Sequence, residues 1–170
     1  MITVELTTGD LRQVEQHINA LFAAKATSGL SVTKFRPTTG TIWDAYRRGY
    51  GAEVAVARWL DRPWKPLISK VRYSSEAIPP DVEPDIEVRS TQNAANPILH
   101  VGMKDVLSRR FVLCLTDDGA VVHLLGWIWG DEAHALGPLM KREREDSAEL
   151  YEAWAVPTDR LRGIYTFNKR

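Results

Sequence analysis

The stretch RFVLCLTDDGAVVHLLGWIW, residues 110–129, has the composition of two strands and a turn. Its two apolar runs are separated by Asp117, Asp118 and Gly119, a sequence typical of a tight turn between antiparallel strands. Cys114, the only cysteine in the chain, lies in the first run and is expected to be a small buried hydrophobic residue rather than a nucleophile. A β-hairpin is therefore predicted over residues 110–129.

Further strands and two helices are predicted on either side of this hairpin. The other strand-like runs are residues 2–6, 66–73, 85–91, 98–102 and 151–156. Helical spacing of apolar residues predicts helices over 9–26 and 41–60. Residues 141–150 are expected to be helical or loose, and 158–163 to form a turn or short helix. Helices that precede a meander of strands indicate an α+β fold, with helices flanking a mostly antiparallel or mixed central sheet.

The bulk composition is that of an ordinary globular protein. Its 170 residues, 44% hydrophobic and 26% charged, suffice for one sizeable core, so residues 1–170 are predicted to form a single domain. The longest apolar run, residues 120–128, is too short to span a membrane, and the N-terminus lacks the features of a signal peptide. A cytoplasmic protein with no membrane partner is therefore expected. The 22 basic and 22 acidic residues argue mildly against a nucleic-acid partner, although local basic patches remain able to bind one.

The helix over 41–60 carries a carboxylate where an apolar residue is expected. Plotted at about 100° per residue, its packing stripe consists of Ile42, Tyr46, Gly49, Val56 and Leu60. Glu53 lies in the middle of this stripe. Because burying an unpaired charge costs several kcal/mol, Glu53 needs an ion pair, a hydrogen bond at the edge of the core, or a functional ligand. Gly49 and Gly51 weaken the same helix, which suggests close approach of another backbone or of a ligand.

The stretch PPDVEPDIEVRST, residues 79–91, concentrates four carboxylates and an arginine. In a strand over its second half, Asp85, Glu87 and Arg89 share one face, while their apolar neighbours enter a core. A turn ahead of the strand brings Asp81 back alongside it. Converging carboxylates form an oxygen-rich site suited to Mg²⁺ or Mn²⁺. A polar outer face with acid–arginine pairs explains the same pattern and stays open as the alternative.

Glu53 and this stretch together resemble the PD-(D/E)XK nuclease superfamily, which has the restriction-endonuclease-like fold, and in particular its small phage and bacterial members. The resemblance rests on the helix motif GAEVAVARWL with Glu53, on proline-aspartate at 80–81 and on the triplet EVR at 87–89, in that order. It spans residues 41–135 and includes the later GWIWGDEA. It implies a mixed central sheet flanked by helices and a divalent metal held by the glutamate and the two acids. It also implies a basic residue, usually lysine, that positions or activates the attacking water.

Carried onto this chain, the resemblance implies a Mg²⁺- or Mn²⁺-dependent nuclease that cleaves DNA or RNA. Glu53, Asp81 and Glu87 would hold the metal, with Asp85 as a second candidate because it also follows a proline. A hairpin would place Asp81 across from Glu87, which favours Asp81. Arg89 replaces the usual lysine; its guanidinium stays protonated and cannot act as a general base, but it can bind the scissile phosphate. The predicted catalytic residues are Asp81, Glu87 and Arg89.

Basic and aromatic residues outside this motif are the candidates for nucleic-acid contact. The basic ones are Arg47, Arg48, Lys104, Arg109 and Arg110. Trp127 and Trp129 share one face of a strand and suit base stacking, core packing or a homodimer contact. Lys104 and Asp105 are expected to be solvated loop residues or an extension of the polar site. A catalytically inactive module that binds nucleic acid or protein, and a structural phage-type protein with a surface acidic cluster, are the alternatives to a nuclease.

Overall fold

The hairpin predicted over residues 110–129 is confirmed in the computed structural model, as strands β4 (Arg110–Leu115) and β5 (Val121–Trp129). The structure describes residues 1–27, 41–66, 79–144 and 147–167. In the turn between the two strands Gly119 has a φ of +80°, a left-handed conformation that glycine adopts without strain. The hydroxyl of Thr116 closes the turn, accepting from Gly119 N–H at 2.9 Å and donating to Val121 C=O at 2.7 Å.

Sheet A is built around this hairpin. Its strand order is β1-β5-β4-β2, with β1 (Ile2–Glu5) and β2 (Ile86–Thr91) at the edges, and the short β8 (Arg162–Gly163) pairs with β5. β1 and β4 run antiparallel to β5, whereas β2 runs parallel to β4, so the sheet is mixed. The predicted α+β fold with a mixed sheet is therefore confirmed.

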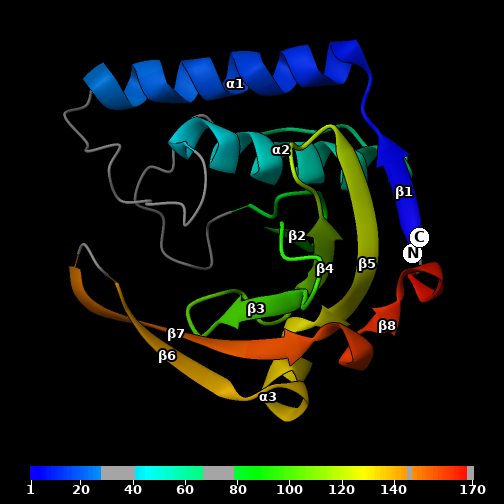
Figure 1. Ribbon diagram of the computed structural model, residues 1–170, viewed down its shortest axis with the longest axis vertical. Coiled ribbons are helices and arrows are strands. Elements are labelled where there is room, and N and C mark those ends of the chain that lie inside the picture. The colour runs from blue at the N-terminus through cyan, green and yellow to red at the C-terminus, as the bar shows by residue number, and fades with distance from the viewer. Residues whose placement is uncertain (28–40, 67–78, 145–146, 168–170) are drawn as a thin grey trace.

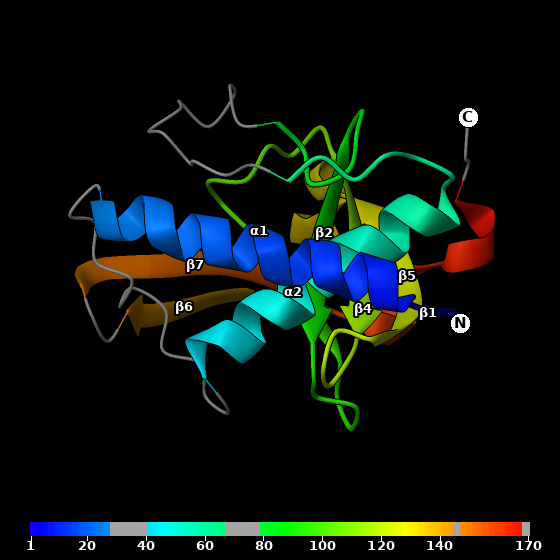
Figure 2. The ribbon, with the colours of Figure 1, turned by 90° about the horizontal axis from the view of Figure 1, so that it is seen from above.

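Two helices cover one face of sheet A. α2 (Ile42–Trp59) lies against the sheet and α1 (Thr8–Thr27) packs on α2, as Figures 1 and 2 show. Val14 and Ile18 of α1 pack with Val54 of α2. The core between α2 and sheet A contains Ala52, Ala55, Val56, Val88, Val112, Cys114, Val122 and Leu124. Cys114 is fully buried, which confirms the expected hydrophobic role, and burial raises the pKa of its thiol.

α2 begins at a capping box and has two packed faces. Thr41 Oγ1 accepts from Asp44 N–H at 3.2 Å, and the Asp44 carboxylate accepts from Thr41 N–H at 2.8 Å, so each residue satisfies a free amide of the other. One face of the helix packs on the sheet and the other on α1. The single stripe predicted from the sequence is therefore too simple, because α2 is sandwiched between two layers.

A second sheet covers the other face of sheet A. Sheet B consists of β3 (Ile98–Gly102), β7 (Ser147–Pro157) and β6 (Leu139–Arg144), antiparallel in the order β3-β7-β6. The core between the sheets contains Leu99, Val101, Phe111, Leu113, Ile128 and Val156.

The prediction that residues 141–150 are helical or loose is wrong, since 141–144 and 147–150 belong to β6 and β7. β6 is an edge strand of sheet B, where charged residues are favoured over apolar ones. Lys141 and Glu152 pair across the two strands at 2.9 Å. The charged composition of β6 therefore hid the apolar alternation by which a strand is recognised in the sequence.

Short helical segments complete the described chain. They are η3 (Gly130–Glu132), α3 (Ala133–Leu136), η4 (Thr158–Arg160) and η5 (Ile164–Thr166). The expected turn or short helix at 158–163 corresponds to η4 and β8, whereas residues 67–73 of the strand expected at 66–73 lie outside the described ranges.

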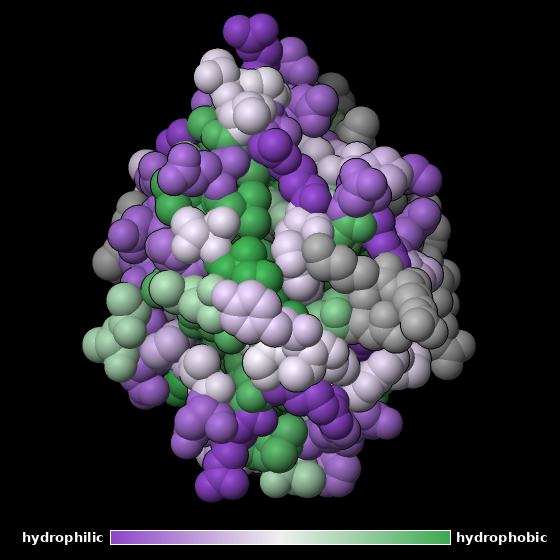
Figure 3. All heavy atoms as spheres, turned by 90° about the vertical axis from the view of Figure 1, so that its right-hand side faces the viewer, coloured by the Kyte–Doolittle hydropathy of each residue, from purple (hydrophilic) through white to green (hydrophobic). Residues whose placement is uncertain are grey.

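Seen from the side of β1, β5 and β8, apolar side chains form a band between polar ones (Figure 3). Within the described ranges, no helix has the length and apolar character that crossing a bilayer requires.

α2 crosses the β4–β5 turn with the two backbones in contact. A Cβ atom at Gly51 would overlap the carbonyl oxygen of Gly119 and lie 2.9 Å from its carbonyl carbon. By contrast, no atom lies within 4 Å of a Cβ placed at Gly49. The close approach suggested by the two glycines is therefore confirmed at Gly51 alone, and it is made by a backbone.

Gly51→Ala is expected to lower the free energy of unfolding by about 1–3 kcal/mol, because the new methyl group must displace the Gly119 backbone. Gly49→Ala, its control in the same helix, is expected to raise the free energy of unfolding by about 0.5–1 kcal/mol, since alanine favours helix and the site is open. Urea unfolding followed by circular dichroism measures both changes. Equal effects of the two substitutions would contradict the backbone contact.

Candidate functional site

β2 brings two predicted site residues to an edge of sheet A. Ile86 and Val88 are buried in the core beneath α2, so Glu87 and Arg89 point to the opposite face of the sheet. On that face the Arg89 guanidinium lies over the ring of Phe111, 5.2 Å from the ring centroid. Phe111 belongs to the core between the two sheets, so the charged residues lie beside that core.

A tight turn ahead of β2 sets the position of Asp81. Val82 and Ile86 exchange two backbone hydrogen bonds of 3.0 Å, so the chain folds back on itself before the strand. Asp81 Oδ2 then accepts from Val88 N–H at 2.8 Å. The turn therefore brings Asp81, rather than Asp85, alongside Glu87.

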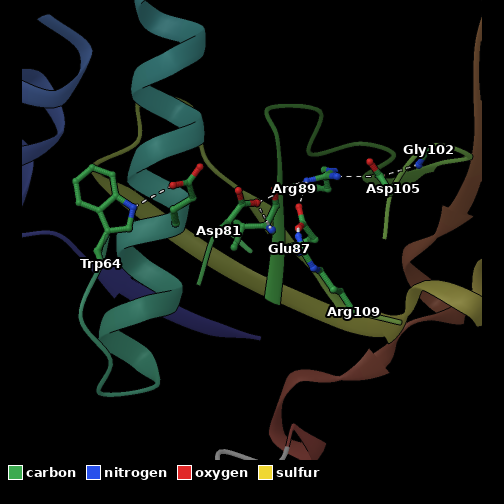
Figure 4. Close-up of polar contacts among 9 residues, drawn as sticks. Trp64, Asp81, Glu87, Arg89, Gly102, Asp105 and Arg109 are labelled. Carbon is green, nitrogen blue, oxygen red and sulfur yellow. Dashed lines mark hydrogen bonds and ion pairs between the residues drawn. The ribbon is translucent and has the colours of Figure 1, made fainter. Parts of the chain in front are cut away.

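One nitrogen of Arg89 is surrounded by oxygens of this segment. Nη1 lies 3.2 Å from Glu87 Oε2 and 3.2 Å from the backbone carbonyl oxygen of Val88. It lies 3.7 Å from Asp81 Oδ2. Figure 4 shows Asp81 and Glu87 toward one end of this guanidinium, with Asp105 beyond its other end. A positively charged group therefore occupies a position bounded by two carboxylates and a carbonyl.

The other terminal nitrogen of Arg89 is bound by Asp105. Nη2 donates to Asp105 Oδ2 at 2.9 Å, and the same oxygen accepts from Gly102 N–H at 2.9 Å (Figure 4). Of the two roles expected for Asp105, solvated loop residue or extension of the polar site, the contacts support the second. The available signal was its position three residues after Gly102, a spacing typical of turns closed by an aspartate side chain.

Arg109 completes a group that we call the Arg89 cluster, which consists of Asp81, Glu87, Arg89, Asp105 and Arg109. Arg109 Nη1 donates to Glu87 Oε1 at 2.5 Å, and both side chains are only 12% exposed. The cluster holds three carboxylates and two guanidinium groups, which leaves one excess negative charge when all are ionised. It is therefore a partly buried group of charges that is close to balanced.

The protonation of the cluster follows from this crowding. Burial and the neighbouring Asp81 carboxylate raise the pKa of Glu87 above its ordinary value, although Arg89 and Arg109 act in the opposite direction. Burial acts to lower the pKa of Arg89, but the surrounding carboxylates, Asp105 foremost, outweigh it and raise that pKa. Arg89 is therefore a permanent cation and not a general base.

Glu53 is half-buried in α2 and has a hydrogen-bond donor. Trp64 Nε1 donates to Glu53 Oε2 at 3.0 Å (Figure 4). Burial raises the pKa of Tyr50, and the negative charges of Glu53 and Asp81 act in the same direction. Of the roles that the sequence left open for Glu53, the hydrogen-bonded carboxylate at the edge of the core has direct support. No spacing rule marks Trp64 as its partner.

Asp85, the second candidate metal ligand, is bound by Arg110. Its carboxylate accepts from Nε at 2.8 Å and from Nη2 at 2.5 Å, a bidentate pair. The Arg110 side chain is 9% exposed, and its guanidinium lies over the rings of Phe167 and Trp129, 4.4 and 5.6 Å from their centroids. Asp85 precedes β2, so the alternation of the strand does not place it beside Glu87. The described contacts support a structural ion pair between Asp85 and Arg110, while a metal-ligand role for Asp85 and a nucleic-acid contact for Arg110 stay predictions.

The remaining basic candidates lie on different elements. Arg47 and Arg48 are in α2, where the Arg47 backbone meets the β4–β5 turn. Lys104 is exposed in the loop between β3 and β4, next to Asp105, and Arg109 is engaged by Glu87. From this set, the structure therefore places Arg109 in the Arg89 cluster, and Lys104 next to Asp105 in the chain.

The two tryptophans of β5 pack with the C-terminal segment. Trp127 is 7% exposed, and its ring lies 6.1 Å from that of Trp129 and 5.1 Å from that of Phe167. Its Nε1 donates to Thr166 Oγ1 at 3.2 Å. Core packing is therefore favoured for Trp127 over base stacking or a homodimer contact.

The donor atoms of the Arg89 cluster suit a hard divalent cation in type but not in their present arrangement. Across the described residues, no three His, Cys, Asp or Glu side chains converge as a metal-binding group. Mg²⁺ does not require three, because it keeps several waters and is commonly held by one or two carboxylates. Asp81, Glu87 and the Val88 carbonyl provide such a set around Arg89 Nη1. These three groups could hold the cation only after Arg89 Nη1 has moved away from them.

Comparisons with protein-family models, with curated proteins and with solved structures found no match to this chain. The resemblance to PD-(D/E)XK nucleases therefore rests on the motifs in the sequence alone.

Asp85→Asn is expected to lower the free energy of unfolding by about 3 kcal/mol, because it removes the carboxylate that pairs with the buried Arg110. It is expected to leave the affinity for Mn²⁺ unchanged. Asp159→Asn, at an exposed position, is the matched control and is expected to change stability by less than about 0.5 kcal/mol. Urea unfolding measures the change in stability, and titration calorimetry measures the affinity for Mn²⁺. If Asp85→Asn stays folded but binds Mn²⁺ more weakly, Asp85 is a metal ligand after all.

Proposed function

We propose that this protein is a Mg²⁺- or Mn²⁺-dependent nuclease that hydrolyses phosphodiester bonds of DNA or RNA in the cytoplasm. The observation that carries the proposal is the position of Arg89 Nη1, a cationic nitrogen bounded by Asp81 Oδ2, Glu87 Oε2 and the Val88 carbonyl oxygen. Oxygen donors of this kind suit a hard divalent cation. The cationic Nη1 of Arg89 thus occupies the position that we assign to the metal.

Asp81, Glu87 and the Val88 carbonyl are the proposed metal-holding groups. Glu53, which the resemblance implies as a further ligand, accepts from Trp64 Nε1 through Oε2, and its role as a ligand stays a prediction. When bound, the metal supplies charge stabilisation at the phosphate and a lowered pKa of a bound water. Hydrolysis breaks one P–O bond, with water supplying the hydroxyl group to phosphorus and a proton to the departing sugar oxygen.

Arg89 has the role of a phosphate contact in this proposal. Its permanent charge excludes general-base catalysis, but a guanidinium binds phosphate oxygens in a bidentate manner and stabilises negative charge that develops there. Its side chain is 30% exposed, so a substrate can reach it. The exposed Lys104 lies in the neighbouring loop and adds positive charge for the nucleic-acid backbone.

A catalytically inactive module that binds nucleic acid or protein is the second candidate. One observation favours it: Arg89 and Arg109 already form ion pairs with the carboxylates that a metal would need. An arrangement that is neutralised internally has less need of a metal. The two functions differ in whether a divalent cation can displace Arg89 Nη1.

Cleavage assays with single-stranded, double-stranded and branched DNA and with RNA, in Mg²⁺ and in Mn²⁺, test the proposal. The wild-type protein is expected to cleave at least one of these substrates and to bind Mn²⁺ in titration calorimetry. Glu87→Gln is expected to lower the cleavage rate by about 10²–10³-fold, the usual effect of removing one electrostatic contributor to a transition state.

Glu152→Gln provides the control for the loss of a carboxylate, because Glu152 pairs with Lys141 on sheet B rather than with the Arg89 cluster. It is expected to leave cleavage unchanged. If every substrate stays intact and Mn²⁺ does not bind, the nuclease proposal is contradicted. Nucleic-acid binding that persists in that case would select the inactive module.

A further inference from the structure

The Arg89 guanidinium is held by two separate sets of contacts. Nη1 faces the oxygens that we assign to a metal, Asp81 Oδ2, Glu87 Oε2 and the Val88 carbonyl. Nη2 faces Asp105, which comes from the loop after β3 and takes no part in that oxygen set. A divalent cation in the first position would compete with Nη1 for those oxygens, whereas Asp105, the acceptor of Nη2, lies outside that set.

The Asp105 carboxylate is fixed by its own turn before it meets Arg89. Asp105 N–H donates to Gly102 C=O at 3.0 Å, and Gly102 N–H donates back to Asp105 Oδ2 at 2.9 Å. A Cβ atom at Gly102 would lie 3.4 Å from Oδ2, at ordinary van der Waals distance, so the carboxylate packs directly against this turn. The acceptor for Nη2 is thus preorganised and does not depend on Asp81 or Glu87.

We propose that Asp105 is the positioning residue that keeps the Arg89 guanidinium at the site when a cation takes the place of Nη1. The metal part of this inference rests on the proposed function. With Asp105 holding Nη2 and Phe111 lying against the guanidinium, Arg89 turns away from Asp81 and Glu87 but remains beside them. Its freed Nη1 then faces the phosphate of a substrate. Without Asp105, Asp81 and Glu87 are the carboxylates that remain around Arg89, and it competes with the metal for both.

The contact itself is tested in the metal-free protein by NMR of arginine labelled with ¹⁵N. The Nη2 protons of Arg89, identified by their loss in Arg89→Lys, are expected to resonate downfield because they donate to a carboxylate. Asp105→Asn keeps an oxygen for Gly102 N–H but removes the negative charge, and it is expected to shift the Nη2 protons upfield while the Nη1 protons stay. Asp118→Asn is the matched control, since Asp118 accepts from Ala120 N–H in another turn. An unchanged Nη2 signal in Asp105→Asn would overturn the proposal.

The effect on the metal is tested by Mn²⁺ affinity in a double-mutant cycle. Asp105→Asn is expected to weaken Mn²⁺ binding about 10-fold when Arg89 is present, a typical effect of losing a residue that supports the groups around a metal. In an Arg89→Ala background the same substitution is expected to have a markedly smaller effect, because no guanidinium competes. Equal losses in both backgrounds would show that Asp105 acts only as a nearby charge, and would overturn the positioning role.

Failure of the proposed function has a different signature. If the wild-type protein binds no Mn²⁺, the nuclease proposal fails, and the NMR comparison of Asp105→Asn with Asp118→Asn still decides whether Asp105 positions Arg89. If Mn²⁺ binds and moves the Nη1 signals of Arg89 while the Nη2 signals stay, both proposals are supported. If Mn²⁺ moves both the Nη1 and the Nη2 signals to the chemical shifts of an unbound arginine, the proposal that Asp105 keeps hold of Nη2 is contradicted.

Discussion

The parallel pairing of β2 with β4 is the constraint on which the candidate site depends. Its register runs from Ile86 opposite Arg110 to Thr91 opposite Leu115, and a shift by one residue would exchange the two faces of the strand. Burial of apolar residues beneath α2 excludes such a shift, because it would put Glu87 into the core. Hydrophobic packing, and not ion pairing, therefore decides that the charged residues of β2 point to the face shared with sheet B.

The charges at that face compete for the same oxygens. Asp81 and Glu87 lie close together and partly buried, so their repulsion has to be balanced by a cation. Arg89 supplies that cation from β2, and Arg109 supplies a second one from the residue before β4. The same two carboxylates are the groups that the proposed metal would need, so the arginines and that metal would compete for them. The observed ion pairing and the proposed metal binding are thus two ways of balancing the same negative charge.

Predictions from the sequence succeeded where one local rule decides the outcome. The hairpin at 110–129 and the alternation of β2 follow from turn chemistry and from a period of two. Asp85 lies just outside the strand, so the period did not apply to it and its carboxylate turned to Arg110. The expectation of a partner for Glu53 was sound, but its partner Trp64 comes from beyond the helix and follows no spacing rule. Edge strand β6 escaped notice because its charged residues carry no apolar signal.

The arginine at position 89, where the PD-(D/E)XK pattern usually has a lysine, is better understood from the geometry of its contacts than from its basicity. A lysine ammonium is a single point, which cannot reach the Asp81 and Glu87 oxygens and Asp105 with separate nitrogens. The planar guanidinium directs Nη1 to the first set and Nη2 to the second, at 3.2 Å from Glu87 and 2.9 Å from Asp105. The forked side chain of Arg89 and the fixed Asp105 carboxylate therefore depend on each other, because the second nitrogen of the guanidinium needs an acceptor of its own. Because the Arg89 guanidinium cannot accept a proton, any general base at this site must be another group. The contribution of Arg89 is electrostatic, since its two terminal nitrogens are bound to the surrounding carboxylates.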